Sequence, residues 1–308
     1  MQNKTVIKIE NLRKVYTSIA AVDDISFEVN EGEIFGMVGP NGAGKTTTIE
    51  CIEGLRQPES GNIKVLGLDP HKNEYALRPR VGVQLQQSAL PHRIKVWEAL
   101  DLFAAFYSSS VNWQELINQL GLEESRNLPF ARLSGGQKQR LFIALALIND
   151  PELVFLDELT TGLDPQARRT MWDMVINIRD NGKTVFLTTH FMEEAERLCD
   201  RVAILDKGKI VALDSPENLI RNLGAEHRVV FTVQDNIEPN VAELHRLAAV
   251  TLVETIGERV VVHGQGDRLV VEVVNFLSVN SIRFRDLRTE QPSLEDVFIA
   301  LTGREMRN

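Results

Sequence analysis

The stretch GPNGAGKT at residues 39–46 constrains this chain more than any other, because it matches the pattern G-x-x-x-x-G-K-[ST] at every fixed position. The apolar run Ile34–Val38 before it is typical of a buried strand, and residues 46–52 after it can continue as a helix. Strand, glycine loop and helix form the context in which this pattern binds phosphate. A glycine-rich turn before a helix is the simpler alternative, and the two flanking elements argue against it.

The residue types in this loop suit a triphosphate. The loop must wrap backbone N–H groups around the phosphates, and side chains at Gly39, Gly42 or Gly44 would block the close approach. Lys45 adds a point charge that can reach the β- and γ-phosphates. The Thr46 hydroxyl is placed to hold Mg²⁺, which prefers oxygen ligands.

Length, composition and charge limit the number of domains and the classes of protein to which this chain can belong. A chain of 308 residues suggests two domains, and its hydrophobic content of 43% is ordinary for a globular protein. No apolar run approaches the roughly 18 residues of a membrane span, and no apolar signal segment follows Met1, so we expect a cytosolic chain. The net charge of −9 argues against broad nucleic-acid binding. Cys51 and Cys199 are each expected in a helix, as small core residues in a reducing compartment.

A second anion site is indicated far from the first along the chain. Ser134 is a good N-cap, and Gly135 and Gly136 leave backbone N–H groups open at the start of a helix that carries Leu141 and Leu145 on one stripe. One nucleotide does not need two such sites from distant segments of one chain. Two chains arranged head to tail could use both.

Two predicted strands end in groups that can act on a phosphate. The apolar residues 153–156 deliver Asp157, which can hold the Mg²⁺ shell, and Glu158, which can take a proton from an attacking water. His190 follows the buried strand Thr184–Thr189 and could donate a hydrogen bond to the γ-phosphate. The simpler interpretations are an acidic pair at a turn and a structural histidine, and the phosphate loop favours the catalytic ones.

The other patterns indicate an α/β fold. Alternation and short apolar runs predict strands over residues 6–10, 25–29, 61–66 and 81–85, and the first two suggest a small antiparallel sheet. Residues 96–149 are helical by pattern, which predicts a helical insertion into the nucleotide domain. Tyr16 lies between the first two strands, where its ring could stack on a base or pack as an ordinary tyrosine.

In this order the motifs resemble the ATP-binding subunit of ATP-binding-cassette (ABC) transporters, over about residues 4–220. The most specific motif is LSGGQ at residues 133–137, which matches the signature sequence of the family. The resemblance implies a P-loop NTPase cassette over residues 1–222, with a parallel core sheet, an antiparallel β subdomain and a helical subdomain at about residues 87–150. It also implies ATP and Mg²⁺ as cofactors.

The resemblance also implies roles for individual residues. Glu158 resembles the general base, His190 the switch histidine, and Gln86 the glutamine that senses Mg²⁺ and the attacking water, although Gln84 and Gln87 are close to it. The family usually has proline after the catalytic glutamate, and Leu159 here leaves the stiffness of that turn open. The implied nucleotide contacts, which include the partner-facing Asp164, are Tyr16, Gly39, Pro40, Asn41, Gly42, Ala43, Gly44, Lys45, Thr46, Thr47, Ser134, Gly135, Gly136, Gln137 and Asp164. The implied metal contacts are Thr46, Gln86 and Asp157, and Lys45 joins Glu158, His190 and Gln86 in the catalytic set.

The tail over residues 225–308 predicts a separate domain. Its elements follow the order β-α-β-β-α-β, which suggests a ferredoxin-like α+β domain, and a final helix begins after Pro292. This ending resembles that of export-type subunits for drugs, ions or lipids, whose permeases are separate polypeptides. Similar tails regulate or dimerise, and the tail shows no ligand motif.

The predicted function is an ATPase that energises a membrane permease it does not contain. Two copies would sandwich two ATP molecules on the cytoplasmic side of the membrane, and residues 86–97 would meet the permease unless they form an ordinary surface loop. One alternative is a non-transport ABC ATPase on the ribosome or DNA, although such proteins carry paired cassettes, long coiled coils or zinc cysteines. A regulatory module without useful turnover is the other. No nucleic-acid partner is expected, and the cargo does not follow from these motifs.

Overall fold

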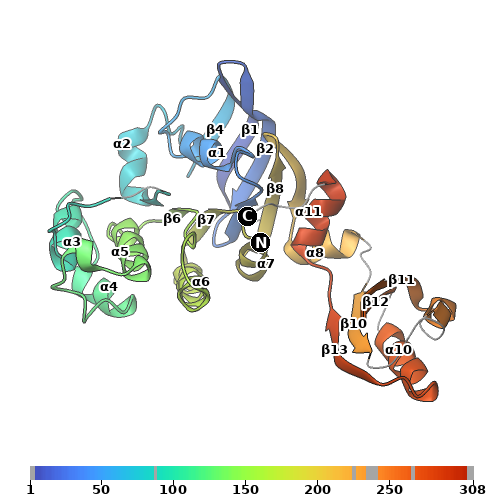
Figure 1. Cartoon of the computed structure of the whole chain (residues 1–308). Helices are drawn as coiled ribbons and strands as arrows, with labels where there is room; N and C mark the ends of the chain where they lie inside the picture. The colour runs from blue at the N-terminus through green and yellow to red at the C-terminus, as the bar shows by residue number, and fades with distance from the viewer. Residues whose placement is uncertain (1–3, 87–88, 224–226, 234–241, 265–267, 304–308) are drawn as a thin grey trace. The chain divides into compact units, whose positions relative to one another are not determined.

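The computed structural model describes residues 4–86, 89–223, 227–233, 242–264 and 268–303. The chain divides into two compact units, Met1–Pro216 and Glu217–Glu305, and each is described by itself (Figure 1). The short helix α8 (Pro216–Asn222) lies at this division, whereas the sequence predicts that the first domain extends through residue 222.

A six-stranded sheet forms the centre of the first unit, in the order β5-β6-β7-β3-β8-β9. Neighbouring strands from β5 to β8 are parallel, and β9 pairs antiparallel with β8. Every residue of β3, β6 and β7 is buried, which explains why these strands read as continuous apolar runs. The strands are β3 (Ile34–Val38), β5 (Val81–Gln84), β6 (Leu153–Asp157), β7 (Thr184–Thr189), β8 (Arg201–Asp206) and β9 (Lys209–Asp214).

A three-stranded antiparallel sheet in the order β2-β1-β4 shares a hydrophobic core with the central sheet. Its strands are β1 (Thr5–Tyr16), β2 (Ile19–Asn30) and β4 (Ser60–Val65), and helix α1 (Lys45–Ile52) contributes to the same core. The ring of Phe27 stacks on that of Phe35 at 5.3 Å, and Phe35 on Phe186 at 5.6 Å, so aromatic contacts cross from one sheet to the other. Strands β1 and β2 are each longer than the predicted strands over residues 6–10 and 25–29, and Tyr16 is the last residue of β1.

Two helices pack on the central sheet away from α1 (Figure 1). Helix α6 (Pro165–Asp180) buries Met171, Trp172, Val175 and Ile178, which recur at helical spacing. Helix α7 (Met192–Leu198) follows β7 and packs on β3 and β7. Cys199 is buried in extended backbone just after α7, so its predicted helical position is wrong, whereas Cys51 lies within α1.

Between β5 and β6 the chain forms a helical segment. The continuous helical pattern over residues 96–149 is three separate helices, α3 (Val96–Ala104), α4 (Trp113–Gln119) and α5 (Gly135–Leu147). Caps explain the breaks, because the Asn112 side chain accepts a hydrogen bond from Gln114 N, and Ser134 accepts one from Gln137 N. The short turn η2 (Phe130–Arg132) lies in the same segment, whereas α2 (Glu74–Leu77) and η1 (Arg78–Arg80) precede β5.

The second unit contains an antiparallel sheet in the order β11-β12-β10-β13. Its elements follow the predicted order, with a short 3-10 helix in the first helical position. They are β10 (His227–Val233), η3 (Ala242–Arg246), β11 (Val250–Ile256), β12 (Arg259–Gly264), α10 (Arg268–Val279) and β13 (Phe284–Glu290). Ser293 caps the final helix α11 (Leu294–Thr302), and its Asp296 pairs with Arg228 of β10 at 2.6 Å.

The carboxylate that ends α1 is buried. Glu53 is the C-cap of this helix, and neither of its carboxylate oxygens has a hydrogen-bond partner. Burial, together with repulsion from Asp157 and Glu50, raises the pKa of Glu53 to about 8. The negative end of the helix dipole further disfavours the charged form.

We expect Glu53→Gln to stabilise the isolated subunit increasingly as the pH rises from about 5 to about 8, with no further gain at higher pH. Because folding raises this pKa from 4.5, the folded state loses stability as the pH rises through the interval up to about 8. An amide cannot ionise, so the variant avoids a loss of at most about 5 kcal/mol. The measurement is the thermal midpoint of both proteins across this pH range, and a midpoint difference that does not grow with pH would contradict the assignment.

Candidate nucleotide and catalytic site

The phosphate loop joins the end of β3 to the start of α1, as the sequence predicts. The backbone at Gly44 has a φ of 107°, and an added Cβ would lie 2.3 Å from the Ala21 carbonyl oxygen. A Cβ at Gly39 would lie 2.3 Å from the Leu205 carbonyl oxygen, whereas one at Gly42 would meet nothing within 4 Å. Neighbouring backbone therefore requires two of these glycines, in addition to any need for close approach to phosphate.

The remaining loop residues surround the N-terminus of α1. Asn41 is exposed, Pro40 is half-buried and Ala43 is buried. Thr46 and Thr47 are half-buried in the first turn of the helix. Open N–H groups and the helix dipole at this end favour an anion.

Lys45 reaches from this loop to the end of β6. Its Nζ donates to the carbonyl oxygens of Gly39 and Pro40 at 2.9 and 3.3 Å, and lies 3.6 Å from Glu158 Oε1. The side chain is almost fully buried, and this burial lowers its pKa, while Glu158 and Asp157 act in the opposite direction. A cationic group is thus held between the phosphate loop and the acidic strand end.

Three segments that are distant in sequence meet at the Glu158 carboxylate. Gln86 Nε2 donates to Glu158 Oε2 at 2.8 Å, His190 Nδ1 lies 3.6 Å from the same oxygen, and Lys45 faces the other oxygen. Glu158 itself has a φ of 49°, a left-handed value that is uncommon outside glycine. This backbone is secured by a hydrogen bond of 3.1 Å from Glu158 N to the Thr188 carbonyl oxygen, and Leu159 after it is buried.

Asp157 and Thr188 form a second buried contact at this site. Asp157 is 2% exposed, and the Thr188 hydroxyl donates a hydrogen bond to its Oδ1. Burial raises the pKa of Asp157, and that hydrogen bond opposes the shift. Thr188 was not among the predicted site residues. The signal for it was a hydroxyl residue near the end of the predicted strand Thr184–Thr189, just before His190.

The structure separates the two candidate glutamines that it describes. Gln86 contacts Glu158, whereas the buried Gln84 donates from Nε2 to the Leu85 carbonyl oxygen at 2.7 Å. Gln87, the third candidate, lies outside the described residues. The predicted choice of Gln86 therefore rests on a contact with the proposed general base, and its role as a sensor stays a prediction.

The signature motif lies apart from this cluster. Ser134 and Gln137 form a reciprocal capping box at the start of α5, with distances of 2.8 and 3.2 Å, and Gln137 also donates to Ser125. Ser134, Gly135 and Gly136 line a concavity of about 320 Å³ together with Asp164, the N-cap of α6. Among the described residues, none of the phosphate loop lines this concavity.

Tyr16 has an exposed ring at the end of β1. Lys14 Nζ and Arg56 Cζ lie 5.4 and 5.3 Å from its centroid. Stacking on adenine stays a prediction for this residue.

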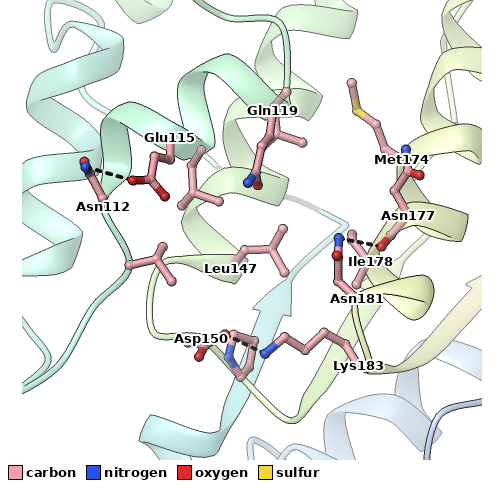
Figure 2. Close-up of a pocket in the computed structure, with 14 residues that line it drawn as sticks. Asn112, Glu115, Gln119, Leu147, Asp150, Met174, Asn177, Ile178, Asn181 and Lys183 are labelled. Carbon is pink, nitrogen blue, oxygen red and sulfur yellow. Dashed lines mark hydrogen bonds and ion pairs between the residues drawn. The ribbon is translucent and has the colours of Figure 1, made fainter.

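A further cleft of about 410 Å³ lies between α4 and α6 (Figure 2). Glu115 and Gln119 of α4 face Asn177 of α6 across it, and Asp150 pairs with Lys183 at its edge. None of the predicted site residues lines this cleft among the described residues, so it is separate from the cluster at Glu158.

Comparison with known proteins decides the family. Residues 22–161 match the family described as ABC transporter. The Nod factor export ATP-binding protein I of Ralstonia nicotianae is 36% identical, over 98% of this chain and 95% of that protein. The protein of the same name from Bradyrhizobium diazoefficiens is 39% identical, over 97% of each. The chain belongs to the ABC transporter family.

Solved structures agree with this membership. An ATP-binding subunit of an ABC transporter is 30% identical with a TM-score of 0.65, covering 71% of this chain and 94% of that one. A dimeric bacterial ABC transporter cassette is 28% identical with a TM-score of 0.61, covering 68% and 98%. The predicted ABC cassette fold is therefore confirmed, and the chain is an ATP-binding subunit with ATPase activity.

The relatives differ in how much of this ABC subunit they match. The two Nod factor export proteins cover nearly all of it, whereas both solved cassettes cover about 70%. The match to the sequence relatives therefore includes the C-terminal unit. None of the helices described here combines the length and apolar character that a membrane crossing requires.

Proposed function

We propose that two copies of this ABC subunit enclose two ATP molecules and energise a separate membrane permease. The observation that carries the proposal is that neither Lys45 nor Glu158 lines the concavity of Ser134 and Asp164. One chain thus presents two incomplete half-sites, and a second copy can complete each of them. A related solved cassette is described as dimeric, which supports this arrangement.

In this proposal Glu158 is the general base and Mg²⁺ assists at the phosphates. The donor set suits the ion, because Thr46, Asp157 and Gln86 would offer a hydroxyl, a carboxylate and an amide oxygen. Mg²⁺ supplies charge neutralisation when it is bound. Glu158 accepts a proton from water, Gln86 orients its carboxylate and Lys45 contributes positive charge. His190, whose Nδ1 lies 3.6 Å from the same carboxylate, would donate a hydrogen bond to the γ-phosphate.

Closure of the two copies would couple binding to movement. Residues around Ser134 would cover the nucleotide of the partner chain and exclude water, and hydrolysis would reopen the pair. The subunit would therefore act peripherally at the cytoplasmic side of the membrane, with residues 86–97 close to the permease.

We propose export as the direction of transport. Both sequence relatives are named as Nod factor export proteins, and they match this subunit along nearly its whole length, including the tail. The cargo class that we expect is drugs, ions or lipids, and its selection would lie in the permease. A non-transport ABC ATPase on the ribosome or DNA is the alternative.

The test is a pull-down of tagged Glu158→Gln from detergent-solubilised membranes with ATP and Mg²⁺, read by mass spectrometry. The variant should hold the closed pair, so we expect one polytopic membrane protein in about equal amount to the subunit. Ser134→Arg serves as the control that cannot close. Recovery of ribosomes or DNA-bound proteins in place of a membrane protein would support the alternative.

A further inference from the structure

One glutamate of helix α7 is buried close to the catalytic cluster. Glu193 and Glu196 of this helix are exposed, whereas Glu194 between them is 2% exposed. The helix begins two residues after His190 and packs against α6 (Figure 1). A glutamate is rarely buried to this extent unless polar groups hold its carboxyl, so the neighbours of Glu194 decide what it does.

Polar groups from three segments surround the Glu194 carboxyl. Trp172 Nε1, from α6, donates a hydrogen bond to Glu194 Oε1 at 3.0 Å. The hydroxyl of Thr189, at the end of β7, acts on the same carboxyl, and so does that of Thr160. Burial raises the pKa of Glu194, whereas these three donors oppose the shift. The carboxyl therefore gathers donors that belong to separate parts of the chain.

The turn that carries His190 depends on one of these donors. Phe191 N donates to Thr189 Oγ1 at 3.0 Å, which closes the backbone around His190. Because this hydroxyl accepts through its oxygen, its own proton is available to the Glu194 carboxyl beside it. His190 Nδ1 is buried without a hydrogen-bond partner among the described residues, so the turn and the Phe191 ring, 4.1 Å away between centroids, position the imidazole.

The other two donors connect Glu194 to the rest of the shared site. Thr160 follows Glu158 by two residues, in a turn that lacks the proline usual in the family. Trp172 belongs to α6, whose N-terminal end lines the concavity of the signature motif. One buried side chain thus joins the turn of the proposed base, the turn of the histidine and the helix that begins at the concavity.

We propose that Glu194 is a positioning residue of the ATPase, whose carboxyl accepts from Trp172 and the Thr189 hydroxyl and so fixes the turn that presents His190 to the γ-phosphate. The inference rests on the proposed function, since it assumes that role for His190. Glu194 acts through the turn, so its loss slows the reaction without weakening ATP binding. A buried residue that only supports the fold would change stability alone.

The first test replaces the carboxyl by an apolar group of similar length. In folded Glu194→Met, kcat should fall at least about tenfold, while KM for ATP changes less than about twofold. Glu193→Met makes the same change at an exposed position of α7 and should keep kcat within about twofold of the parent. The measurements are steady-state phosphate release against ATP concentration and the thermal midpoint of each variant.

The second test changes the turn and leaves Glu194 in place. Thr189→Val removes the hydroxyl and should lower kcat as Glu194→Met does, whereas Thr189→Ser retains a hydroxyl and should stay within about threefold of the parent. Because both residues act on one turn, the double variant should be no more than about twofold slower than Glu194→Met alone.

His190→Ala separates a failure of this inference from a failure of the proposed function. If His190→Ala hydrolyses ATP at the parental rate, the role of His190 is wrong and the inference falls with it. If His190→Ala is slow but folded Glu194→Met keeps the parental kcat, only the inference is overturned. Should Glu194→Met not fold, parental turnover by Thr189→Val would overturn it, as would losses that multiply in the double variant.

Discussion

Glu158→Gln is expected to lower steady-state ATP turnover at least about a hundredfold while ATP binding survives. An amide cannot accept the proton of the attacking water, but its oxygen can still accept the hydrogen bond from Gln86 that the carboxylate accepts at 2.8 Å. The geometry around Lys45 and His190 should therefore persist, and the variant should accumulate as an ATP-bound pair.

The measurements are phosphate release, nucleotide binding by titration calorimetry, and the size of the complex with ATP. Glu193→Gln is the matched control, because this exposed glutamate of α7 undergoes the same chemical change away from the cluster. It should retain turnover within about twofold. Parental turnover by Glu158→Gln would show that another group is the base.

Ser134→Arg is expected to reduce turnover at least about a hundredfold without weakening ATP binding by the single chain. Ser134 is exposed at the N-terminus of α5, and among the described residues none of the phosphate loop lines its concavity, so the substitution should leave the phosphate loop of the same chain intact. An arginine there adds bulk and a positive charge to the surface that faces the partner's nucleotide. Ser134→Ala is the comparison variant: it loses the cap, at about 1 kcal/mol, and the hydroxyl that would face the partner's nucleotide, but it adds neither bulk nor charge, so its turnover should fall less than that of Ser134→Arg.

Mixing two inactive variants provides the sharper test. Ser134→Arg keeps a working Lys45, and Lys45→Ala keeps a working Ser134, so a mixed pair contains one complete site. Partial turnover should return on mixing and be absent from either variant alone. Loss of ATP binding by the Ser134→Arg monomer would argue against a site shared between two chains.

The elements built from short-range physics could be predicted from the sequence. The phosphate loop, the buried strands β6 and β7 and the cap at Ser134 depend on backbone angles, apolar runs and hydrogen bonds within a few residues. The break before α4 was missed, because a helical pattern over residues 96–149 does not show that α3 ends at Ala104 or that Asn112 caps a new helix. The position of Cys199 was wrong for the same reason.

The sequence by itself determined that this chain carries a phosphate loop, an acidic strand end and a signature motif in cassette order. Only the tertiary structure decided that Gln86, and not Gln84, contacts Glu158, and that Thr188 holds Asp157. Those contacts join segments that are far apart in the chain, and local patterns carry no information about which side chains meet. The same limit hid Glu53, whose buried carboxylate lines a pocket together with residues of β5 and the helical segment.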